Sequence, residues 1–422
     1  MAFEPGEPEK KQSNDKFFTP PLIIIFVTVF IDLIGFGMVI PILPFYAETD
    51  PFNASPIEIG ALFAVYSLMQ FIFSPMLGRL SDQYGRRPIL FISILGSALG
   101  YFVIGFANTL FLVFLGRIIG GITGANISTA QAYIADVTTR ENRARGMGLF
   151  GATFGLGFIL GPAIAGILSK YGVHVPFYCA AVLSLANAIA LYFFLPESLK
   201  PEKRKAAVRG TNKLGPLIES LKEPQFGTLN LVYFLLITAF SIMTYAFVLF
   251  TAFRYGYTAE QNGYLFAYVG MMSVIGQGLL FGFLVRRIGE AVLACIGCFL
   301  MAVSLFVMPF IGPVQGGLIA LLGCCTVLSI GNAMASPSLT SLVSKITAEH
   351  EQGSRLGIMQ SGASLARAIG PMVGGILLNN SVNRIDDLTV TRTFFAASAI
   401  MTAALIVSIF AVRVVRNAQT VS

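Results

Sequence analysis

The chain has 422 residues, of which 55% are hydrophobic and 12% are charged, and its mean hydropathy is +0.76. A soluble domain carries roughly twice that share of charged residues, so the composition excludes a soluble enzyme or soluble binding module. The net charge of +7 would suit a nucleic-acid partner, but the placement of the charges described below excludes one.

Twelve apolar segments are long enough to cross a bilayer as helices, which takes about 20 residues each. In chain order they are residues 21–46, 57–78, 88–107, 110–135, 145–169, 175–195, 227–252, 261–285, 290–310, 314–344, 354–379 and 393–413. They are too long and too weakly alternating to be strands of a membrane β-barrel. The sequence therefore predicts an all-α integral membrane protein with twelve transmembrane helices.

Positive charge indicates the orientation of these helices. With both termini in the cytoplasm, all but six of the 28 Lys and Arg residues fall in cytoplasmic segments, as the positive-inside rule requires. The exceptions are Lys170, Arg254, Arg384 and Arg392 outside, and Arg117 and Arg367 within the membrane. Residues 1–19 resemble a polar tail and not a cleavable signal, so we expect the first helix to direct insertion.

The longest polar stretch separates six helices from six. We therefore expect a cytoplasmic tail (1–19), an N-terminal six-helix bundle (20–196), a cytoplasmic linker (197–226), a C-terminal six-helix bundle (227–413) and a second cytoplasmic tail (414–422). Within the linker, residues 214–221 form either a short amphipathic helix on the membrane surface or part of a plain basic connection.

The two bundles repeat each other in sequence. Gly161-Pro162 corresponds to Gly370-Pro371, and the stretch from Gly78 to Gly85 corresponds to the stretch from Gly282 to Gly289. Parallel six-helix repeats with a substrate site between them, near the membrane midplane, are typical of alternating-access transporters. The repeat thus predicts two pseudo-symmetric bundles and a site where they meet.

Asp32 stands alone in the apolar first helix, where a carboxylate costs several kcal/mol unless it is paired, hydrated or protonated. At 1.5 Å per residue, Asp32 lies about 16 Å from the inner face, and Arg117 in the fourth helix lies about 20 Å from it. The similar depths predict that Asp32 takes up a proton and that Arg117 stabilises its charged form. The alternative is a static buried pair.

The loop between the second and third helices reads Gly78-Arg-Leu-Ser-Asp82-Gln-Tyr-Gly85-Arg86-Arg87. Asp82 suits the N-terminus of a neighbouring helix, and Arg86 suits a carboxylate such as Asp136 at the inner end of the fourth helix. The pattern resembles the loop 2–3 motif of the major facilitator superfamily. The resemblance implies the fold of that superfamily and a conformational gating role for Gly78, Asp82, Gly85, Arg86, Arg87 and Asp136.

Two more runs resemble motifs of that superfamily. The run from Leu115 to Ala125 is similar to its fourth-helix motif, which centres on an arginine linked to proton transfer, here Arg117. Its usual glutamine is replaced by Gly120. In the fifth helix, Gly157, Gly161, Pro162 and Gly166 allow close helix contact and a kink. This run is similar to the antiporter motif, which accompanies efflux, and implies a gating role for these four residues.

The first-helix run from Asp32 to Pro44 resembles the twelve-helix, proton-coupled tetracycline and multidrug antiporters. Gln277 matches a substrate-side glutamine of the tetracycline pumps. Their eighth-helix histidine is Ser273 here, and residues 300–306 lack their ninth-helix carboxylate. A magnesium–tetracycline chelate is therefore disfavoured as the substrate, and an apolar or cationic drug or another metabolite stays open.

Polar side chains inside the membrane are the candidates for substrate contact. They are Gln70, Asn126, Gln131, Gln277, Asn332, Gln360 and Arg367. Each is equally well explained as a hydrogen-bonded bridge between helices. Arg367 is the most informative, because its charge there is costly unless an anionic group accompanies it. Cys295 and Cys298 form a C-x-x-C spacing inside a predicted helix without histidines, which favours packing over metal binding.

These observations predict a proton-coupled secondary active transporter that exports a small amphiphilic, drug-like compound by alternating access. A lipid, lysolipid or metabolite exporter on the same fold is the alternative, and a non-transporting membrane receptor or scaffold is a remote one. We expect no enzyme activity and no cofactor, with the proton gradient as the driving force. The expected partners are the substrate, protons and membrane lipids, and the expected state is a monomer in a bacterial inner membrane.

Overall fold

The structure is a computed structural model that describes residues 18–199, 222–347, 352–381 and 384–419. Regular structure in these ranges is helical, apart from an isolated bridge between Gly312 and Gly316. The first half contains α1 (Pro20–Glu48), α2 (Pro56–Tyr84), α3 (Arg86–Gly105), α4 (Leu110–Thr123), η1 (Gly124–Asn126), α5 (Ile127–Val137), α6 (Arg140–Ser169) and α7 (Val175–Phe194). The second half contains α10 (Pro224–Tyr255), α11 (Ala259–Ile275), η2 (Gly276–Phe281), α12 (Gly282–Val307), η3 (Met308–Phe310), α13 (Gly317–Ile346), α14 (Gln352–Leu378) and α15 (Asp387–Gln419).

The described helices account for all twelve predicted membrane spans. Within the described ranges, eleven stretches are long and apolar enough to cross a membrane, and one of them, Ala259–Phe310, is 52 residues long. The backbone of Gly289 (φ 78°, ψ 161°) breaks this stretch, so it supplies two spans. The prediction of an all-α membrane fold is confirmed. The fourth predicted helix is less regular than expected, because the 3₁₀ turn η1 separates α4 from α5.

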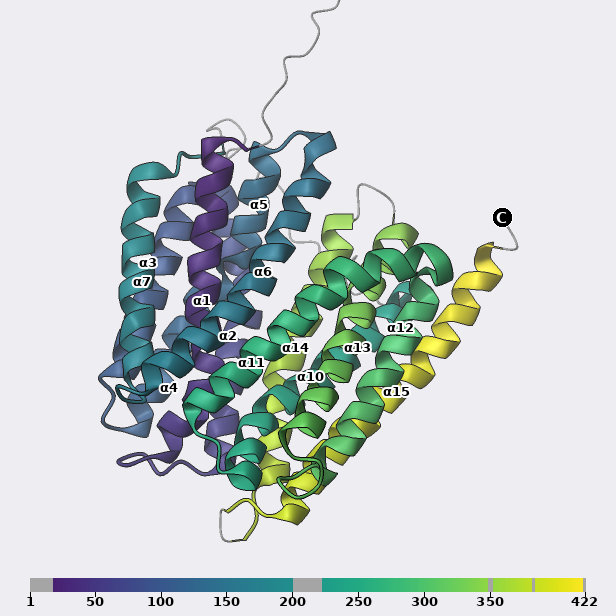
Figure 1. Ribbon diagram of the computed structural model, residues 1–422. Coiled ribbons are helices and arrows are strands. Elements are labelled where there is room, and N and C mark those ends of the chain that lie inside the picture. The colour runs from purple at the N-terminus through teal and green to yellow at the C-terminus, as the bar shows by residue number, and fades with distance from the viewer. Residues whose placement is uncertain (1–17, 200–221, 348–351, 382–383, 420–422) are drawn as a thin grey trace, which may run out of the picture.

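The sequence repeat is visible in the backbone. Gly85, between α2 and α3, has φ 110° and ψ 157°, close to the conformation of Gly289 at the corresponding place in the second half. Positive φ is readily adopted only by glycine, so both halves need this residue to turn from one helix into the next. Figure 1 shows α1–α7 gathered into one bundle and α10–α15 into a second beside it.

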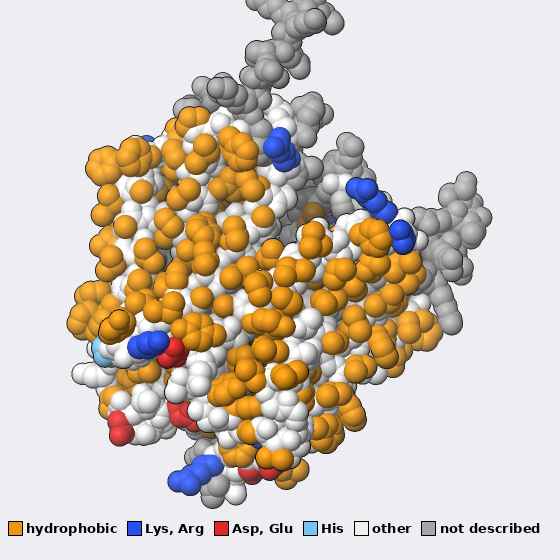
Figure 2. Space-filling model, in the orientation of Figure 1, with side chains coloured by type: hydrophobic (Ala, Val, Ile, Leu, Met, Phe, Trp, Pro, Cys, Tyr) orange, Lys and Arg blue, Asp and Glu red, His pale blue; other side chains and the backbone are white. Residues whose placement is uncertain are grey.

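Apolar side chains cover the outside of both bundles. Figure 2 shows hydrophobic side chains across the middle of the visible face, with the charged ones mainly toward its two ends. Phe111, Tyr171 and Ile319 are among the most exposed, at 72%, 76% and 86%. Such a surface is unfavourable in water and suits the hydrocarbon core of a bilayer.

The halves meet along two helix pairs, α6 with α11 and α2 with α14. We call the end of the molecule that holds the start of α1 the Pro20 end, and the opposite one the Glu48 end. Glycines bring the helices together toward the Glu48 end. A methyl group at Gly263 would lie 2.7 Å from the Cα of Gly166, and one at Gly60 would lie 3.3 Å from the Cα of Gly375.

The α6–α11 contact runs from the Glu48 end only part of the way along the helices. A methyl group at Gly270 would lie 2.9 Å from the carbonyl oxygen of Phe158, and one at Gly155 would lie 2.8 Å from Val274. One turn further toward the Pro20 end, methyl groups at Gly151 and Gly278 would meet nothing within 4 Å. The halves are therefore closed against each other at the Glu48 end and separate toward the Pro20 end.

Two polar contacts also bridge the halves at the Glu48 end. Lys170 and Glu260 form an ion pair of 2.9 Å, and the hydroxyl of Tyr245 donates to the carbonyl oxygen of Pro56. The hydrogen bond to Glu260 raises the pKa of Lys170, which lies just beyond the end of α6. These contacts reinforce the glycine packing at the closed end.

Candidate functional site

A cavity of about 200 Å³ lies between the two halves. Its walls come from α1, α2, α4 and α6 on one side and from α10, α13 and α14 on the other. The lining residues are Phe36, Val39, Ile40, Phe63, Tyr66, Ser67, Arg117, Phe158, Ile237, Phe240, Ser241, Thr244, Tyr245, Asn332, Ser336, Arg367 and Pro371. A cavity shared by two pseudo-symmetric bundles is the expected place for a transported molecule.

Aromatic rings form much of the cavity wall. Phe36 contacts both Tyr66 and Phe158, with ring centroids 5.6 and 6.0 Å apart, and Phe63 packs edge-on against Tyr245 at 6.0 Å. Phe158 corresponds to Arg367 in the sequence repeat, so equivalent positions of α6 and α14 face the same space. The wall suits the apolar body of an amphiphile.

Arg117 belongs to this cavity and does not pair with Asp32. Its side chain is buried, its Nε–H donates to the carbonyl oxygen of Leu62 at 3.0 Å, and its guanidinium lies 4.2 Å from the ring centre of Tyr66. The predicted ion pair is therefore absent from this structure. The depth argument placed the two residues at similar heights, but it could not give the direction in which each helix turns its side chain.

Asp32 lies instead in a second, much smaller cavity inside the first half. That cavity has a volume of about 10 Å³, room for roughly one water molecule, and Thr28, Leu90, Ile94 and Asn126 also line it. The side-chain amide of Asn126 donates to Asp32 Oδ2 at 3.4 Å. The carboxylate thus has one weak polar neighbour and is separated from the central cavity.

Only some of the predicted substrate contacts line the central cavity. Asn332 and Arg367 do. The other five, Gln70, Asn126, Gln131, Gln277 and Gln360, are not among its lining residues in this conformation, so their contact with substrate stays a prediction. Gln70 donates to the carbonyl oxygen of Gly124 at 2.9 Å and Asn126 binds Asp32, so both act as bridges between helices. The sequence could not separate these roles, because both place a polar group inside the membrane.

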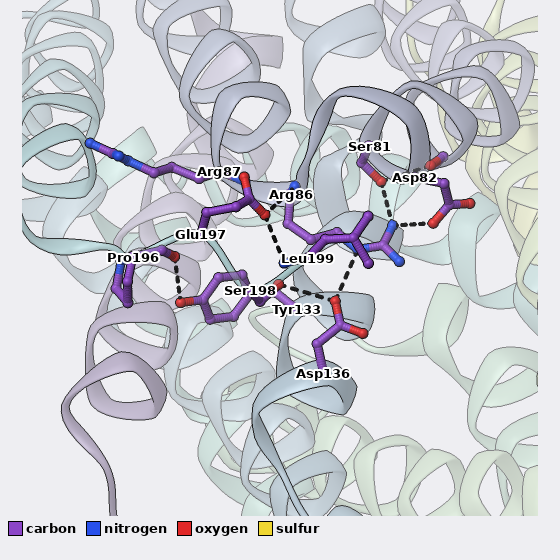
Figure 3. Close-up of polar contacts among 11 residues, drawn as sticks. Ser81, Asp82, Arg86, Arg87, Tyr133, Asp136, Pro196, Glu197, Ser198 and Leu199 are labelled. Atoms are coloured by element: carbon purple, nitrogen blue, oxygen red, sulfur yellow. Dashed lines mark hydrogen bonds and ion pairs between the residues drawn. The ribbon is translucent and has the colours of Figure 1, made fainter. Parts of the chain in front are cut away.

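The loop 2–3 motif forms a network at the Pro20 end of the first half, shown in Figure 3. Arg86 forms an ion pair with Asp82 at 2.5 Å, donates to Ser81 Oγ at 2.7 Å and contacts Asp136 at 3.2 Å. The Arg86–Asp136 contact agrees with the sequence prediction. Asp82 was expected at the N-terminus of a neighbouring helix, but here it binds Arg86 within its own turn.

Glu197 takes the place predicted for Asp82. Its two carboxylate oxygens accept the backbone N–H groups of Arg86 and Arg87 at 2.9 and 3.2 Å, at the N-terminus of α3 (Figure 3). A negative charge there balances the helix dipole and the unpaired amides. Sequence reasoning missed this role, and a glutamate three residues beyond the end of α7 was the only signal.

The segment that contains Glu197 extends the first half beyond its predicted end at residue 196. Ser198 donates to Asp136 at 3.0 Å, Tyr133 donates to the carbonyl oxygen of Pro196 at 2.8 Å, and Leu199 is buried. Residues 197–199 therefore pack on the first bundle, although they were predicted to start the linker. Residues 224–226 of that linker already belong to α10. Residues 214–221, for which an amphipathic helix and a plain basic connection were both left open, lie outside the described residues.

The fifth-helix motif lies in α6, between α1 and the second half. A methyl group at Gly161 would lie 2.8 Å from the Cα of Gly37, and one at Gly157 would lie 2.6 Å from the Cβ of Leu33, next to Asp32. On the other side, Gly166 approaches Glu260 and Gly263 of α11, and the carbonyl oxygen of Pro162 also faces Gly263. The motif thus joins the helix that carries Asp32 to the second half. A methyl group at Gly78 would lie 3.9 Å from Ser128 Oγ.

All five cysteines are free. Cys295 and Cys298 are both free, and Cys295 Sγ lies 3.2 Å from Ser408 Oγ. Within the described ranges, no group of three or more His, Cys, Asp or Glu side chains is placed to hold a metal ion.

The comparisons with known proteins agree with this architecture. The family model described as Major Facilitator Superfamily matches residues 25–344 and 317–421. The chain is 34% identical to the class H tetracycline resistance protein of Pasteurella multocida, over 87% of this chain and 91% of that protein. It is 29% identical to multidrug resistance protein 2 of Bacillus subtilis (strain 168), over 86% and 89% of the two chains. Among solved structures, the human organic anion transporter MFSD10 (TETRAN) matches with a TM-score of 0.67 and 24% identity, over 92% and 99% of the chains, which shows a shared fold.

Proposed function

Because the chain belongs to the major facilitator superfamily and is related to its tetracycline and multidrug resistance proteins, we propose that it exports a small amphiphilic compound in exchange for protons. The observation that carries the proposal is the cavity between the halves, closed at the Glu48 end and bordered by separating helices toward the Pro20 end. Rocking of the two bundles about such a site would expose it to each side in turn.

Asp32 is the proposed proton acceptor. Asp32 is half-buried in a membrane-spanning helix and has one weak hydrogen bond, so its charged form is destabilised unless a change of conformation brings it water or a positive charge. The helix of Asp32, α1, packs directly on Gly157 and Gly161 of α6, and α6 in turn packs on α11 of the second half. Proton uptake at Asp32 would thereby bias the packing between the halves, with no need for contact between Asp32 and the substrate.

The proposed gating elements lie at opposite ends of the molecule. At the Pro20 end, Arg86, Asp82, Asp136 and Glu197 hold the α2–α3 turn rigidly on the first half, so that this half can move as one body. Toward the Glu48 end, the α6 glycines form the sliding surface. Gly78 and Arg87 are proposed to support the α2–α3 turn.

The proposed setting is a bacterial inner membrane, with the Pro20 end in the cytoplasm. The concentration of Lys and Arg in the segments at that end supports this orientation. In it, the present conformation is inward-facing. We propose that the monomer transports without a cofactor and that the proton gradient supplies the energy.

The test is proton release from everted vesicles that carry the protein, with Asp32→Asn as the coupling variant. Tetracyclines, cationic dyes and lysolipids are added in turn to vesicles with an acidic interior. We expect at least one compound to discharge the gradient with the wild-type protein and none to do so with Asp32→Asn. Compound-driven proton release that persists in Asp32→Asn would refute the role of Asp32. Drug accumulation without any proton movement would refute the antiport mechanism.

A further inference from the structure

The central cavity contains positive charge without a compensating negative charge of its own. Arg117 enters it from α4 in the first half and Arg367 from α14 in the second. None of its lining residues in the described chain is Asp or Glu. Arg117, Arg367 and Tyr66 all line this one cavity, and the Arg117 guanidinium lies 4.2 Å from the ring centre of Tyr66.

Each arginine uses only part of its hydrogen-bonding capacity on the protein. Arg117 donates from Nε to the carbonyl oxygen of Leu62, and Arg367 donates from Nη2 to Ser364 of its own helix at 2.9 Å. A guanidinium has five N–H donors, and its planar fork matches a carboxylate or sulfonate. Neither arginine has an ion-pair partner among the described residues, since Asp32 lies in a separate cavity.

Two unpaired cations inside a membrane protein are costly, and such groups are normally accompanied by an anion. The protein supplies polar groups here, such as Ser241, Thr244, Asn332 and Ser336, but these are all neutral. The missing counter-charge can come from a ligand. The rings of Phe36, Tyr66 and Phe158 lie on the same cavity, next to the positive region.

We propose that the substrate is an amphiphilic aromatic anion, whose carboxylate or sulfonate binds between Arg117 and Arg367 while its ring system packs on the aromatic wall. The proposal rests on the export function proposed above and names its substrate class. It differs from the cationic dyes that a multidrug pump would be tested with. For a ligand charge about 5 Å from one guanidinium, at an effective dielectric of about 20, the interaction raises the affinity for an anion on the order of 100-fold and lowers the affinity for a cation by a similar factor.

The binding test uses two dyes that share one fluorophore. Dansylglycine carries a carboxylate and dansylcadaverine carries an ammonium group, and both change emission on entering an apolar site. Because the chain contains no Trp, its own fluorescence interferes little. Titrations of purified protein in detergent need no proton gradient, so failure of the coupling mechanism leaves this test intact. Naphthalene sulfonates and one- to three-ring aromatic carboxylates are added as competitors.

We expect dansylglycine to bind at least about tenfold more tightly than dansylcadaverine. Arg367→Gln should weaken dansylglycine binding about 10- to 100-fold, as expected for loss of a charged hydrogen bond, and leave dansylcadaverine unchanged or tighter. Arg367→Lys keeps the charge and should retain most of the affinity. Arg384→Gln removes the same charge from an exposed position between α14 and α15 and should have no effect.

Equal or tighter binding of dansylcadaverine by the wild-type protein would overturn the proposal. Unchanged dansylglycine affinity in Arg367→Gln would do the same, as would a lack of saturable binding for every anion of the panel. If dansylcadaverine also releases protons from vesicles through Asp32 while no anion binds, the export function stands and the anionic substrate class fails.

Discussion

Gly60 limits how tightly the two halves close at the Glu48 end. A methyl group at this position would lie 2.4 Å from the carbonyl oxygen of Pro371, about 1 Å short of ordinary van der Waals contact. Backbone atoms on both sides leave no flexible side chain to move away. Added volume in such packing costs about 1–3 kcal/mol, and only the conformation closed at this end bears the cost. Gly60→Ala should therefore shift the conformational equilibrium about 5- to 150-fold away from it.

Spin labels can measure this shift at the opposite end of the molecule. Gly151 in α6 and Gly278 in η2 both have open space around them, so cysteines there can carry labels without disturbing this conformation. The five native cysteines are free and would first be replaced. Double electron–electron resonance should show a shorter distance population growing in Gly60→Ala, because the Pro20 end closes as the Glu48 end opens.

Gly323→Ala is the matched control, since a methyl group on this exposed position of α13 meets nothing within 4 Å. An unchanged distance distribution in Gly60→Ala would refute the reasoning. The same shift in Gly323→Ala would show that any added methyl group perturbs the equilibrium and that the α2–α14 contact has no special role.

Two further predictions concern other contacts. Gly166→Val should impair transport more than tenfold, because the valine side chain would clash with the α11 backbone near Glu260. Lys170→Gln, at the same α6–α11 contact, should keep transport within about threefold of wild type, since exposed ion pairs contribute little. Vesicle transport at matched expression checks both, and the reverse order of severity would contradict the packing argument. Glu197→Gln weakens the charged cap of α3 and should lower thermal stability in detergent by about 1 kcal/mol, with the midpoint falling by a few degrees. An unchanged melting temperature would show that the neutral amide caps α3 equally well.

The sequence was sufficient for the number, type and approximate limits of the helices. Membrane spans can be read from sequence because every backbone group in hydrocarbon must be satisfied within its own helix, so length and hydropathy decide where a helix forms. The repeat was equally local information. The repeat aligns Gly289 with Gly85 and Arg367 with Phe158. In the structure the first two share a positive-φ backbone conformation, and the second two line the same cavity from equivalent positions of the two halves.

Side-chain direction was beyond the sequence. Asp32 and Arg117 were predicted to lie at similar depth, yet one faces a small cavity within the first half and the other faces the central cavity. The rotation of a membrane helix about its own axis is set by packing against its neighbours, and hydropathy is nearly uniform around such helices. For the same reason, five of the seven polar residues predicted to contact substrate are not among the residues that line the central cavity in this conformation.

Tertiary structure alone also decided the conformation and the electrostatics of the site. The contact between α6 and α11 ends near Gly155 and Val274, and no sequence pattern could show which end of this joint is closed. The combination of Arg117 and Arg367 in one cavity arises from helices far apart in the chain. Composition alone determined that this chain is a membrane protein, because the free energy of transfer from water to hydrocarbon depends on residue type. The charge of the cavity depends instead on which helices the fold brings together.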